Sequence, residues 1–428
     1  MSSAAESSQL PRDAAAVETA CREMRTVADT PGRPGFRARL AALEHLSDRL
    51  LARDAGVWRG VPPAGLAFLA AFLRASSLEE TLRRELPVEA LERFVAREGR
   101  KSLRLVPKGL ACHWVAGNVP LVGLYSWAMS AVVGNANVIR LSSRQDDIVS
   151  PVLELLTGVS DVGRAMAAET RVVQFDREAR PLHEAMSAVA DVRLAWGGRE
   201  AVESILSLPT SWECDTIVLG PRVSLAVVDP AVATPSVVGR LVSDIVYFDQ
   251  LACSSPQCVF VKGRLGEAAF DGFVDAFTAA FAAQSASIPR HVLDFGETFR
   301  IQLDRSRVAL DFGRVRHDEG TTWTVTVVER PNDAVLCANR FVQVVPYLTV
   351  ADVCAQIPRN IQTVVIVLDD EEAEALSEAA AHRGVCRFPR AGQGNHFESP
   401  WDGAPIASRL TRWVVRTDGS GPRPVGAR

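Results

Sequence analysis

Short β-rich runs alternate with helical stretches from about residue 101 onward, and this alternation allows only a few folds. The runs are apolar on both faces and read SLRLVP, ACHWVAG, ANVIRLS, TRVVQF, DVRLAW, DTIVLG and LAVVD. Helical segments such as LVGLYSWAMSAVV separate them. Strands that are buried on both faces and joined through helices are typical of parallel sheets with a helical layer on each side. The sequence therefore predicts an α/β protein built on doubly wound parallel sheets.

The chain is too long for one such sheet, because 428 residues suit two domains. We expect a helical N-terminal region at 1–100, where RARLAALEHLSDRLLARD repeats apolar residues at helical spacing. The alternation then predicts one α/β domain at 101–220 and a second at 221–400. A C-terminal segment, 401–428, follows.

Composition and missing motifs exclude several classes of protein. The formal net charge of −4 gives no reason to expect a nucleic-acid partner. No C-x-x-C pair occurs among the eight cysteines, so no metal site is predicted. The P-loop, H-E-x-x-H, G-x-S-x-G and G-x-G-x-x-G motifs are also missing. Since the start of the chain lacks a signal-peptide pattern and no apolar run suits a membrane span, we expect a reduced, cytoplasmic protein.

Cys253, in the segment YFDQLACSSPQC, differs from the other cysteines in its surroundings. A helix is expected at about 234–249, and Pro256 follows, so the pattern predicts a turn. Small neighbours leave backbone N–H groups accessible, and the strand expected next would fix the turn. A pair with Cys258 is disfavoured because that residue falls in the strand. The pattern leaves a buried structural thiol and a nucleophile as alternatives.

Asn118 stands where the run HWVAG gives way to a long apolar helix. An asparagine at such a junction commonly caps the helix. Its amide could instead donate a hydrogen bond to an oxyanion that develops during acyl transfer. The residues alone do not decide between these roles.

Taken together, several segments resemble the aldehyde dehydrogenase superfamily. Within it, they resemble the acyl-CoA reductase (LuxC-type) family, whose members reduce activated acyl groups to aldehydes. The segments, in order, are AGNVP, NVIRLSS, AWGG, VLGPRVSLAVVD, DQLACSSPQ, RFVQVVPY and SPWDGAPIASRLTRWV. The resemblance covers about residues 100–415 and leaves the N-terminal hundred residues without a counterpart.

The resemblance implies a function for each part of the chain. Domain 101–220 would bind a nicotinamide cofactor, domain 221–400 would carry the nucleophile, and 401–428 would return to the cofactor domain or form an oligomer interface. Cys253 would attack the acyl carbonyl, with Asn118 and the Cys253 backbone N–H as the oxyanion hole. The implied cofactor-binding residues are Arg140, Ser142, Ser143, Gly197 and Gly198.

Two departures from the superfamily pattern concern glutamates. Val218 stands where aldehyde-oxidising members carry the glutamate that activates water, which favours reduction over hydrolysis of an acyl-enzyme. Asn339 stands at the match of the glutamate that contacts the nicotinamide ribose. The general base is not identified, and His113 and His396 are candidates only because they lie near matched motifs.

The expected reductant is NADPH, with NADH as the alternative. Ser143 replaces the glutamate of NAD-selective members, and Arg140 and Arg144 lie nearby, which would tolerate a 2′-phosphate. The expected substrate is an acyl-CoA or an acyl group on a carrier protein, and the resemblance implies a homo-oligomer. Rival hypotheses are reduction of an acyl phosphate or adenylate, aldehyde oxidation, and a non-catalytic scaffold.

Overall fold

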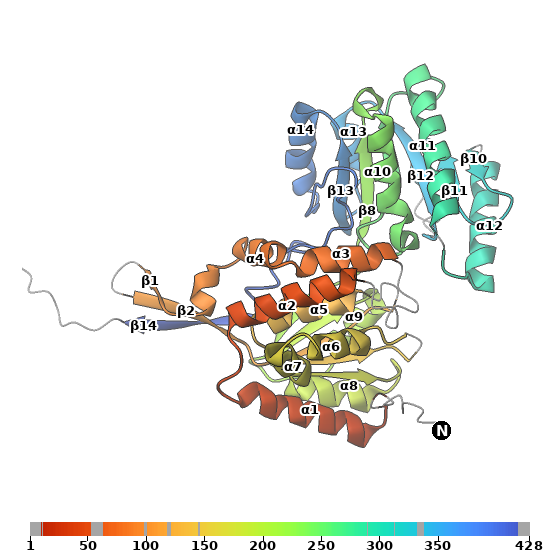
Figure 1. Ribbon diagram of the computed structural model, residues 1–428. Helices are drawn as coiled ribbons and strands as arrows, with labels where there is room; N and C mark the ends of the chain where they lie inside the picture. Colours follow the sequence, from red (N-terminus) through yellow and green to blue (C-terminus); the bar gives the residue numbers. More distant parts are fainter. Residues whose placement is uncertain are drawn as a thin grey trace, which may run out of the picture. The chain divides into compact units, whose positions relative to one another are not determined.

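The computed structural model describes residues 10, 12–52, 63–97, 101–117, 121–143, 146–288, 290–311, 313–331 and 338–417. The chain forms two compact units (Figure 1). Unit 1 comprises Met1–Gly220 and Phe397–Arg428, and unit 2 comprises Pro221–His396. The chain therefore leaves unit 1 once and returns to it near the C-terminus.

Unit 1 is built on a five-stranded parallel sheet in the order β5-β4-β3-β6-β7. Its strands are β3 (Leu110–Trp114), β4 (Ala136–Leu141), β5 (Thr170–Gln174), β6 (Val192–Trp196) and β7 (Asp215–Leu219). The helices between them are α5 (Val122–Val132), α6 (Val149–Thr157), α7 (Asp161–Ala168), α8 (Arg180–Val189) and α9 (Arg199–Leu206). Because the chain winds outward from β3 in both directions, the predicted doubly wound sheet is confirmed.

The expected N-terminal helices are α1 (Ala14–Asp29), α2 (Phe36–Leu51), α3 (Pro63–Leu73) and α4 (Ala75–Arg83), followed by the turn η1 (Val88–Leu91). They are part of unit 1 rather than a separate layer. Cys21 and Met24 of α1 lie in one buried cluster with Leu110 and Cys112 of β3. These two strand residues face α1 because side chains alternate along a strand. Helix α1 therefore completes one face of the sheet.

A small antiparallel sheet, in the order β1-β2-β14, also belongs to unit 1. Its strands are β1 (Val95–Arg97), β2 (Lys101–Pro107) and β14 (Thr411–Thr417). The run SLRLVP was expected to join the α/β alternation, but it lies in β2 and pairs with the C-terminal strand β14. Only Ser102 and Leu105 of β2 are buried, whereas the parallel strands β3, β4 and β6 are buried along their whole length.

Unit 2 is built on a six-stranded sheet in the order β10-β11-β12-β9-β8-β13. Its strands are β8 (Val223–Val228), β9 (Pro256–Lys262), β10 (Arg314–His317), β11 (Thr324–Val327), β12 (Phe341–Tyr347) and β13 (Ile361–Val367). All neighbours are parallel except β10 and β11. The prediction of a second parallel sheet is thus confirmed, with one antiparallel edge strand added.

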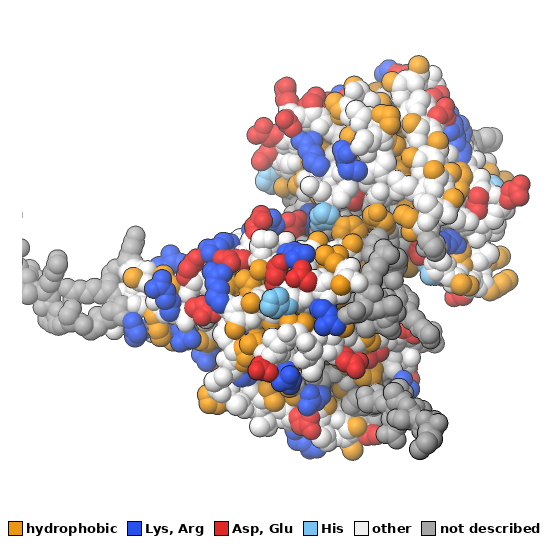
Figure 2. All heavy atoms as spheres, in the orientation of Figure 1, with side chains coloured by type: hydrophobic (Ala, Val, Ile, Leu, Met, Phe, Trp, Pro, Cys, Tyr) orange, Lys and Arg blue, Asp and Glu red, His pale blue; other side chains and the backbone are white. Residues whose placement is uncertain are grey.

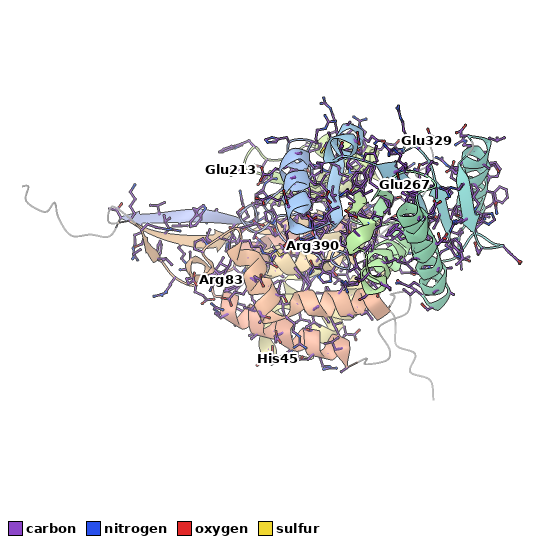
Figure 3. All side chains as sticks on the ribbon, turned by 90° about the horizontal axis from the view of Figure 1, so that it is seen from above. His45, Arg83, Glu213, Glu267, Glu329 and Arg390 are labelled. Atoms are coloured by element: carbon purple, nitrogen blue, oxygen red, sulfur yellow. The ribbon has the colours of Figure 1, made fainter. Side chains whose placement is uncertain are left out.

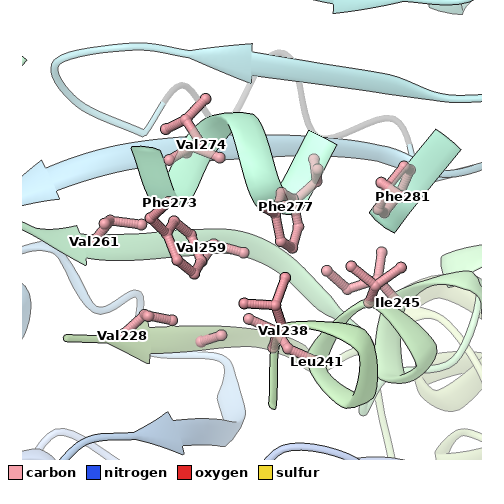
Figure 4. Close-up of a cluster of buried hydrophobic side chains, with 14 of the residues drawn as sticks. Val228, Val238, Leu241, Ile245, Val259, Val261, Phe273, Val274, Phe277 and Phe281 are labelled. Carbon is pink, nitrogen blue, oxygen red and sulfur yellow. The ribbon is translucent and has the colours of Figure 1, made fainter. Parts of the chain in front are cut away.

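Helices cover both faces of this second sheet. They are α10 (Pro235–Val246), α11 (Ala268–Ser287), α12 (Phe295–Leu310), α13 (Val350–Gln356) and α14 (Asp370–Ala381), with the turns η2 (Pro230–Val232) and η3 (Tyr247–Gln250). Three phenylalanines of α11, at 273, 277 and 281, pack against α10 and the strands (Figure 4). This buried layer anchors α10, whose C-terminal end leads to Cys253.

The surface in Figure 2 carries acidic and basic side chains interspersed with apolar ones. Within the described residues, no helix combines the length and the apolar character needed to cross a membrane.

Candidate active site

Cys253 lies in a short loop of unit 2, between η3 and β9. The residue is half-buried, whereas Ser254 and Ser255 after it are buried. Ser224 Oγ, in β8, donates a hydrogen bond to the Cys253 carbonyl oxygen at 2.6 Å. The Ser255 N–H donates to Ala252 O at 3.0 Å and closes a turn. The chain therefore presents a partly accessible thiol from a turn that is fixed to the sheet.

The segment before this turn has an unusual backbone. Phe248, Asp249 and Gln250 have φ values of 57°, 52° and 62°. The expected helix to 249 is therefore wrong at its end, since α10 stops at Val246. Each non-glycine residue in the left-handed region costs about 1 kcal/mol or more. The surrounding contacts must supply that free energy.

Polar contacts hold the left-handed segment in place. The Asp249 carboxylate forms an ion pair with the buried Arg340 guanidinium at 2.7 Å and lies 2.7 Å from His291 Nδ1. Gln250 is fully buried, and its Nε2 donates to Pro256 O at 2.8 Å. Contacts of Asp249 with Arg340 and of Gln250 with Pro256 O thus hold the left-handed segment in place.

Cys258 has the structural role that was predicted. It lies in β9, beside Leu225 of β8 and Gln343 of β12, and its side chain is buried. It belongs to an apolar cluster with Val345 and Tyr347. No group of three or more His, Cys, Asp or Glu able to hold a metal ion occurs in the part of the chain that the structure describes.

Asn118 was predicted to contact the oxyanion, and Asn339 matches the position of a residue that contacts the nicotinamide ribose. Asn118 lies outside the described residues, so its role stays a prediction. Asn339 lies two residues before β12 with a φ of 54°, and its Nδ2 donates to Glu297 Oε1 at 3.3 Å. Sequence reasoning missed this carboxylate, which α12 brings next to the asparagine. Val218, at the other matched position, is half-buried in β7.

The predicted cofactor residues gather at one edge of the unit 1 sheet. Arg140 is in β4, and Ser142 and Ser143 follow this strand. Gly197 and Gly198 follow β6. Because β4 and β6 are both parallel to β3 and flank it, their carboxyl ends meet at the same edge. The strand order reverses at β3, and ligands of open α/β sheets bind in such a crevice.

The backbone at Gly198 leaves space for a phosphate group. It is the N-cap of α9, and a Cβ added to it would meet no heavy atom within 4 Å. A Cβ on Gly197, whose φ is +158°, would lie 3.1 Å from the Ala201 Cβ. The backbone before α9 is thus open, and the N-terminus of a helix favours an anion. The residues present fit the pyrophosphate of a dinucleotide.

The Arg140 guanidinium contacts the protein backbone, and its predicted cofactor contact stays a prediction. Its Nε and Nη2 donate to the Phe175 carbonyl oxygen at 3.1 and 2.6 Å, and the residue is buried. Burial lowers the pKa of the guanidinium from its usual value to about 10. The guanidinium is engaged with the backbone, so it is a structural group in this arrangement. Ser142 is half-buried, and its carbonyl oxygen accepts from Gln174 Nε2 at 3.1 Å.

Ser143 is exposed, and its hydroxyl donates to the carboxylate of Asp176. Asp176 follows β5, the strand beside β4. A carboxylate therefore lies beside residue 143, in the loop after the neighbouring strand β5. An acidic residue directly after the strand TRVVQF was the available sequence signal.

The two histidine candidates have different surroundings, and the general base stays unidentified. His113 is fully buried, with Nδ1 2.7 Å from Ser126 Oγ and Nε2 3.0 Å from Asn137 Oδ1. Burial lowers its pKa from 6.5 to about 4. His113 is a packed histidine, whereas His396 is exposed, with its carbonyl oxygen accepting from Arg387 at 3.0 Å.

A family model and the related proteins all describe acyl reductases. The model of the acyl-CoA reductase (LuxC) family matches residues 42–413. The long-chain acyl-protein thioester reductase of Vibrio harveyi is 23% identical over 342 residues, which cover 80% of this chain and 70% of that protein. The long-chain acyl-protein thioester reductase 2 of Photobacterium leiognathi is 22% identical over 320 residues, 74% of this chain and 66% of that protein. The chain thus spans about two thirds of the length of these relatives.

Solved structures show the same fold at low identity. A putative aldehyde dehydrogenase, PutA, from Anabaena variabilis matches with a TM-score of 0.70 and 14% identity, covering 98% of this chain and 96% of that one. The indole-3-acetaldehyde dehydrogenase AldA of P. syringae, solved with NAD+, matches with a TM-score of 0.69 and 12% identity, covering 95% and 89%. The fold of the chain is that of aldehyde dehydrogenases.

Proposed function

Because the chain belongs to the acyl-CoA reductase (LuxC) family, we propose that it reduces an acyl thioester to an aldehyde through an acyl group held on Cys253. The observation that carries the proposal is the position of this thiol. It is half-buried in a turn that Ser224 and a strained preceding segment hold on the sheet of unit 2. A nucleophile needs such a fixed and partly accessible position, whereas a structural cysteine is buried as Cys258 is.

The proposed chemistry consists of two transfers. The Cys253 thiolate attacks the thioester carbonyl, a new carbon–sulfur bond forms, and the donor thiolate leaves with the electron pair of the broken bond. Asn118 and the Cys253 N–H are proposed to donate hydrogen bonds to the oxyanion in this step. A reduced nicotinamide dinucleotide, when bound, supplies the hydride. The resulting thiohemiacetal on Cys253 then collapses to the aldehyde and the thiol. Val218 offers no base for water, which favours this outcome over hydrolysis.

Residues at the carboxyl edge of the unit 1 sheet are proposed to hold the dinucleotide. Gly197 and Gly198 would contact the pyrophosphate, and Ser142 and Ser143 the adenosine ribose. NADPH is proposed as the reductant because residue 143 itself carries no charge, and NADH is the alternative for two reasons. The Asp176 carboxylate beside Ser143 would repel a 2′-phosphate. The Arg140 guanidinium donates to the Phe175 carbonyl oxygen and does not face such a phosphate as a free cation.

The acyl donor is proposed to be protein-bound, since the relatives are named for acyl-protein thioesters. Acyl-CoA is the alternative thioester donor. A homo-oligomer is also proposed, with the edge strand β14 as the contact.

A donor panel tests the function directly. Purified protein is mixed with acyl-CoA, acyl-carrier protein or acyl phosphate and with NADPH or NADH, and both nicotinamide absorbance and aldehyde are measured. We expect aldehyde from a thioester donor and an acyl adduct on Cys253 in the intact mass. Cys253→Ala should lose both, while Cys258→Ala, the matched control in the same segment, should retain the adduct. Aldehyde formation by Cys253→Ala would refute the proposal.

A further inference from the structure

Asn395 links the Cys253 turn to helix α10 through both ends of its side chain. Its Oδ1 accepts hydrogen bonds from Ser254 Oγ at 2.7 Å and from Ser255 Oγ at 3.3 Å. Its Nδ2 donates to Asp244 O at 2.8 Å. This carbonyl belongs to the last turn of α10, where backbone acceptors have no partner within the helix. The buried Asn395 amide therefore donates a hydrogen bond to the end of α10 and accepts one from Ser254, the residue after Cys253.

The side chain of Asp244 holds the loop that carries Asn395. Its carboxylate accepts from the Gly392 N–H at 2.6 Å and the Gly394 N–H at 3.0 Å. Glycine suits both positions, for different reasons. Gly392 has a φ of +91°, and a Cβ on Gly394 would lie 3.1 Å from the Asp244 Cγ. Asp244 is only 2% exposed, so this carboxylate is buried between α10 and the loop.

Two arginines fix the same loop from its other side. Arg387 donates to Gly394 O at 3.2 Å. Arg390, labelled in Figure 3, donates to Leu368 O at 2.8 Å and pairs with Asp370 at 2.6 Å. The loop therefore has independent anchors, and Asn395 can hold Ser254 without depending on Ser254 for its own position.

Cys253 is consequently held by two hydrogen bonds, one at its own backbone and one at the next residue. Ser224 fixes its carbonyl oxygen, and Asn395 fixes the next side chain, Ser254. We propose that Asn395 and Asp244 are positioning residues for Cys253, acting through Ser254 to keep the thiol and the adjoining N–H in line for acyl transfer. This inference rests on the proposed function, which supplies the natural acyl donor. The same positioning should nevertheless affect the attack of the Cys253 thiolate on any carbonyl.

A positioning role and a purely stabilising role of Asn395 predict different rates for two reactions of the Cys253 thiol. Acyl transfer needs the thiolate and the oxyanion donors in a defined geometry, and a misplacement of about 1 Å costs about 100-fold in rate. Alkylation by iodoacetamide forms a carbon–sulfur bond with loss of iodide and builds no oxyanion. A displaced but folded turn should therefore lose acylation while it keeps alkylation.

The test uses p-nitrophenyl acetate as the acyl donor. The Cys253 thiolate attacks its carbonyl, a thioester forms, and p-nitrophenolate leaves, so neither the natural donor nor a reductant is needed. Ser254→Ala and Asn395→Ala should each lower the acylation rate of Cys253 by about 10- to 100-fold. Their iodoacetamide alkylation rates, read from the Cys253 peptide by mass spectrometry, should stay within about threefold of wild type.

Two matched serine variants complete the test. Ser255→Ala removes the longer bond to the same Asn395 oxygen. Ser47→Ala removes a buried 2.7 Å bond to Ala70 O in unit 1. Both should acylate within about threefold of wild type. Equal losses in all four variants, or no loss in Ser254→Ala, would overturn the positioning role. Wild-type acylation without aldehyde from any thioester would instead refute the proposed function alone.

Discussion

Asp176 lies beside Ser143, where the ribose of the dinucleotide is proposed to bind. Its carboxylate accepts from Ser143 and would repel a 2′-phosphate bound there. We expect Asp176→Asn to raise the ratio of kcat/KM for NADPH over NADH by about tenfold, because one unit charge is removed and the hydrogen-bonding shape is kept. Steady-state kinetics with both cofactors measures the ratio. An unchanged ratio would place the ribose elsewhere.

Gly197 and Gly198 form a second matched pair at the residue scale. Gly198→Ala should leave the melting temperature unchanged, because its Cβ would meet nothing within the protein. It should raise the KM for the dinucleotide about tenfold if the pyrophosphate lies against this backbone. Gly197→Ala should instead lower stability, since its Cβ would press on Ala201 at 3.1 Å. Thermal melts and cofactor titrations separate the two effects.

At the scale of elements, the left-handed segment before Cys253 depends on the ion pair between Asp249 and Arg340. Asp249→Ala would leave a guanidinium that is 1% exposed without its carboxylate. We expect a loss of about 3 kcal/mol in the free energy of unfolding of unit 2, as is typical when one partner of a buried pair is removed. Asp370→Ala, which breaks an exposed pair with Arg390, should cost less than about 1 kcal/mol. Urea unfolding followed by peptide-resolved hydrogen exchange makes the comparison.

Strand β14 is an edge of its sheet and carries exposed apolar side chains. Trp413 is 47% exposed and Val415 57%, and they lie on the same face because they are two residues apart. Edge strands with such residues pair readily with another chain. We expect Trp413→Glu to shift the protein from oligomer to monomer in light scattering. Arg412→Glu, on the opposite face of the strand, is the control that should retain the oligomer.

Much of the fold could be predicted from periodicity, because parallel strands buried on both faces leave a strong apolar signal. The antiparallel β2 was misplaced, since its pairing with β14 joins residues 304 to 316 positions apart that carry no mutual pattern. The thiol was found through neighbouring residue types and the resemblance. Asn395 and Asp244 were missed, because their contacts form only when helix α10 and a loop 150 residues further along the chain meet in space. Asp176 was missed although it directly follows the strand TRVVQF.

At the scale of the whole molecule, the two units should respond to acid in opposite directions. In unit 1, burial lowers the pKa of His113 from 6.5 to about 4, so between these values the unfolded chain binds more protons than the folded one. Stability therefore falls as the pH drops through this window. In unit 2, burial raises the pKa of Asp244 from 3.8 to about 7, so the folded state binds more protons, and stability rises as the pH drops.

Between pH 7 and 5, each effect amounts to about 2 kcal/mol at about 1.4 kcal/mol per pKa unit. His183 in unit 1 has a lowered pKa of about 4 and acts in the same direction as His113. A global melt would average the opposing slopes, so the measurement is hydrogen exchange, corrected for intrinsic rates, on peptides from β3 and β9. The opening free energy should fall for β3 and rise for β9 on acidification. His113→Gln should flatten the first slope and Asp244→Asn the second, whereas slopes of one sign in both units would contradict the buried charges as their cause.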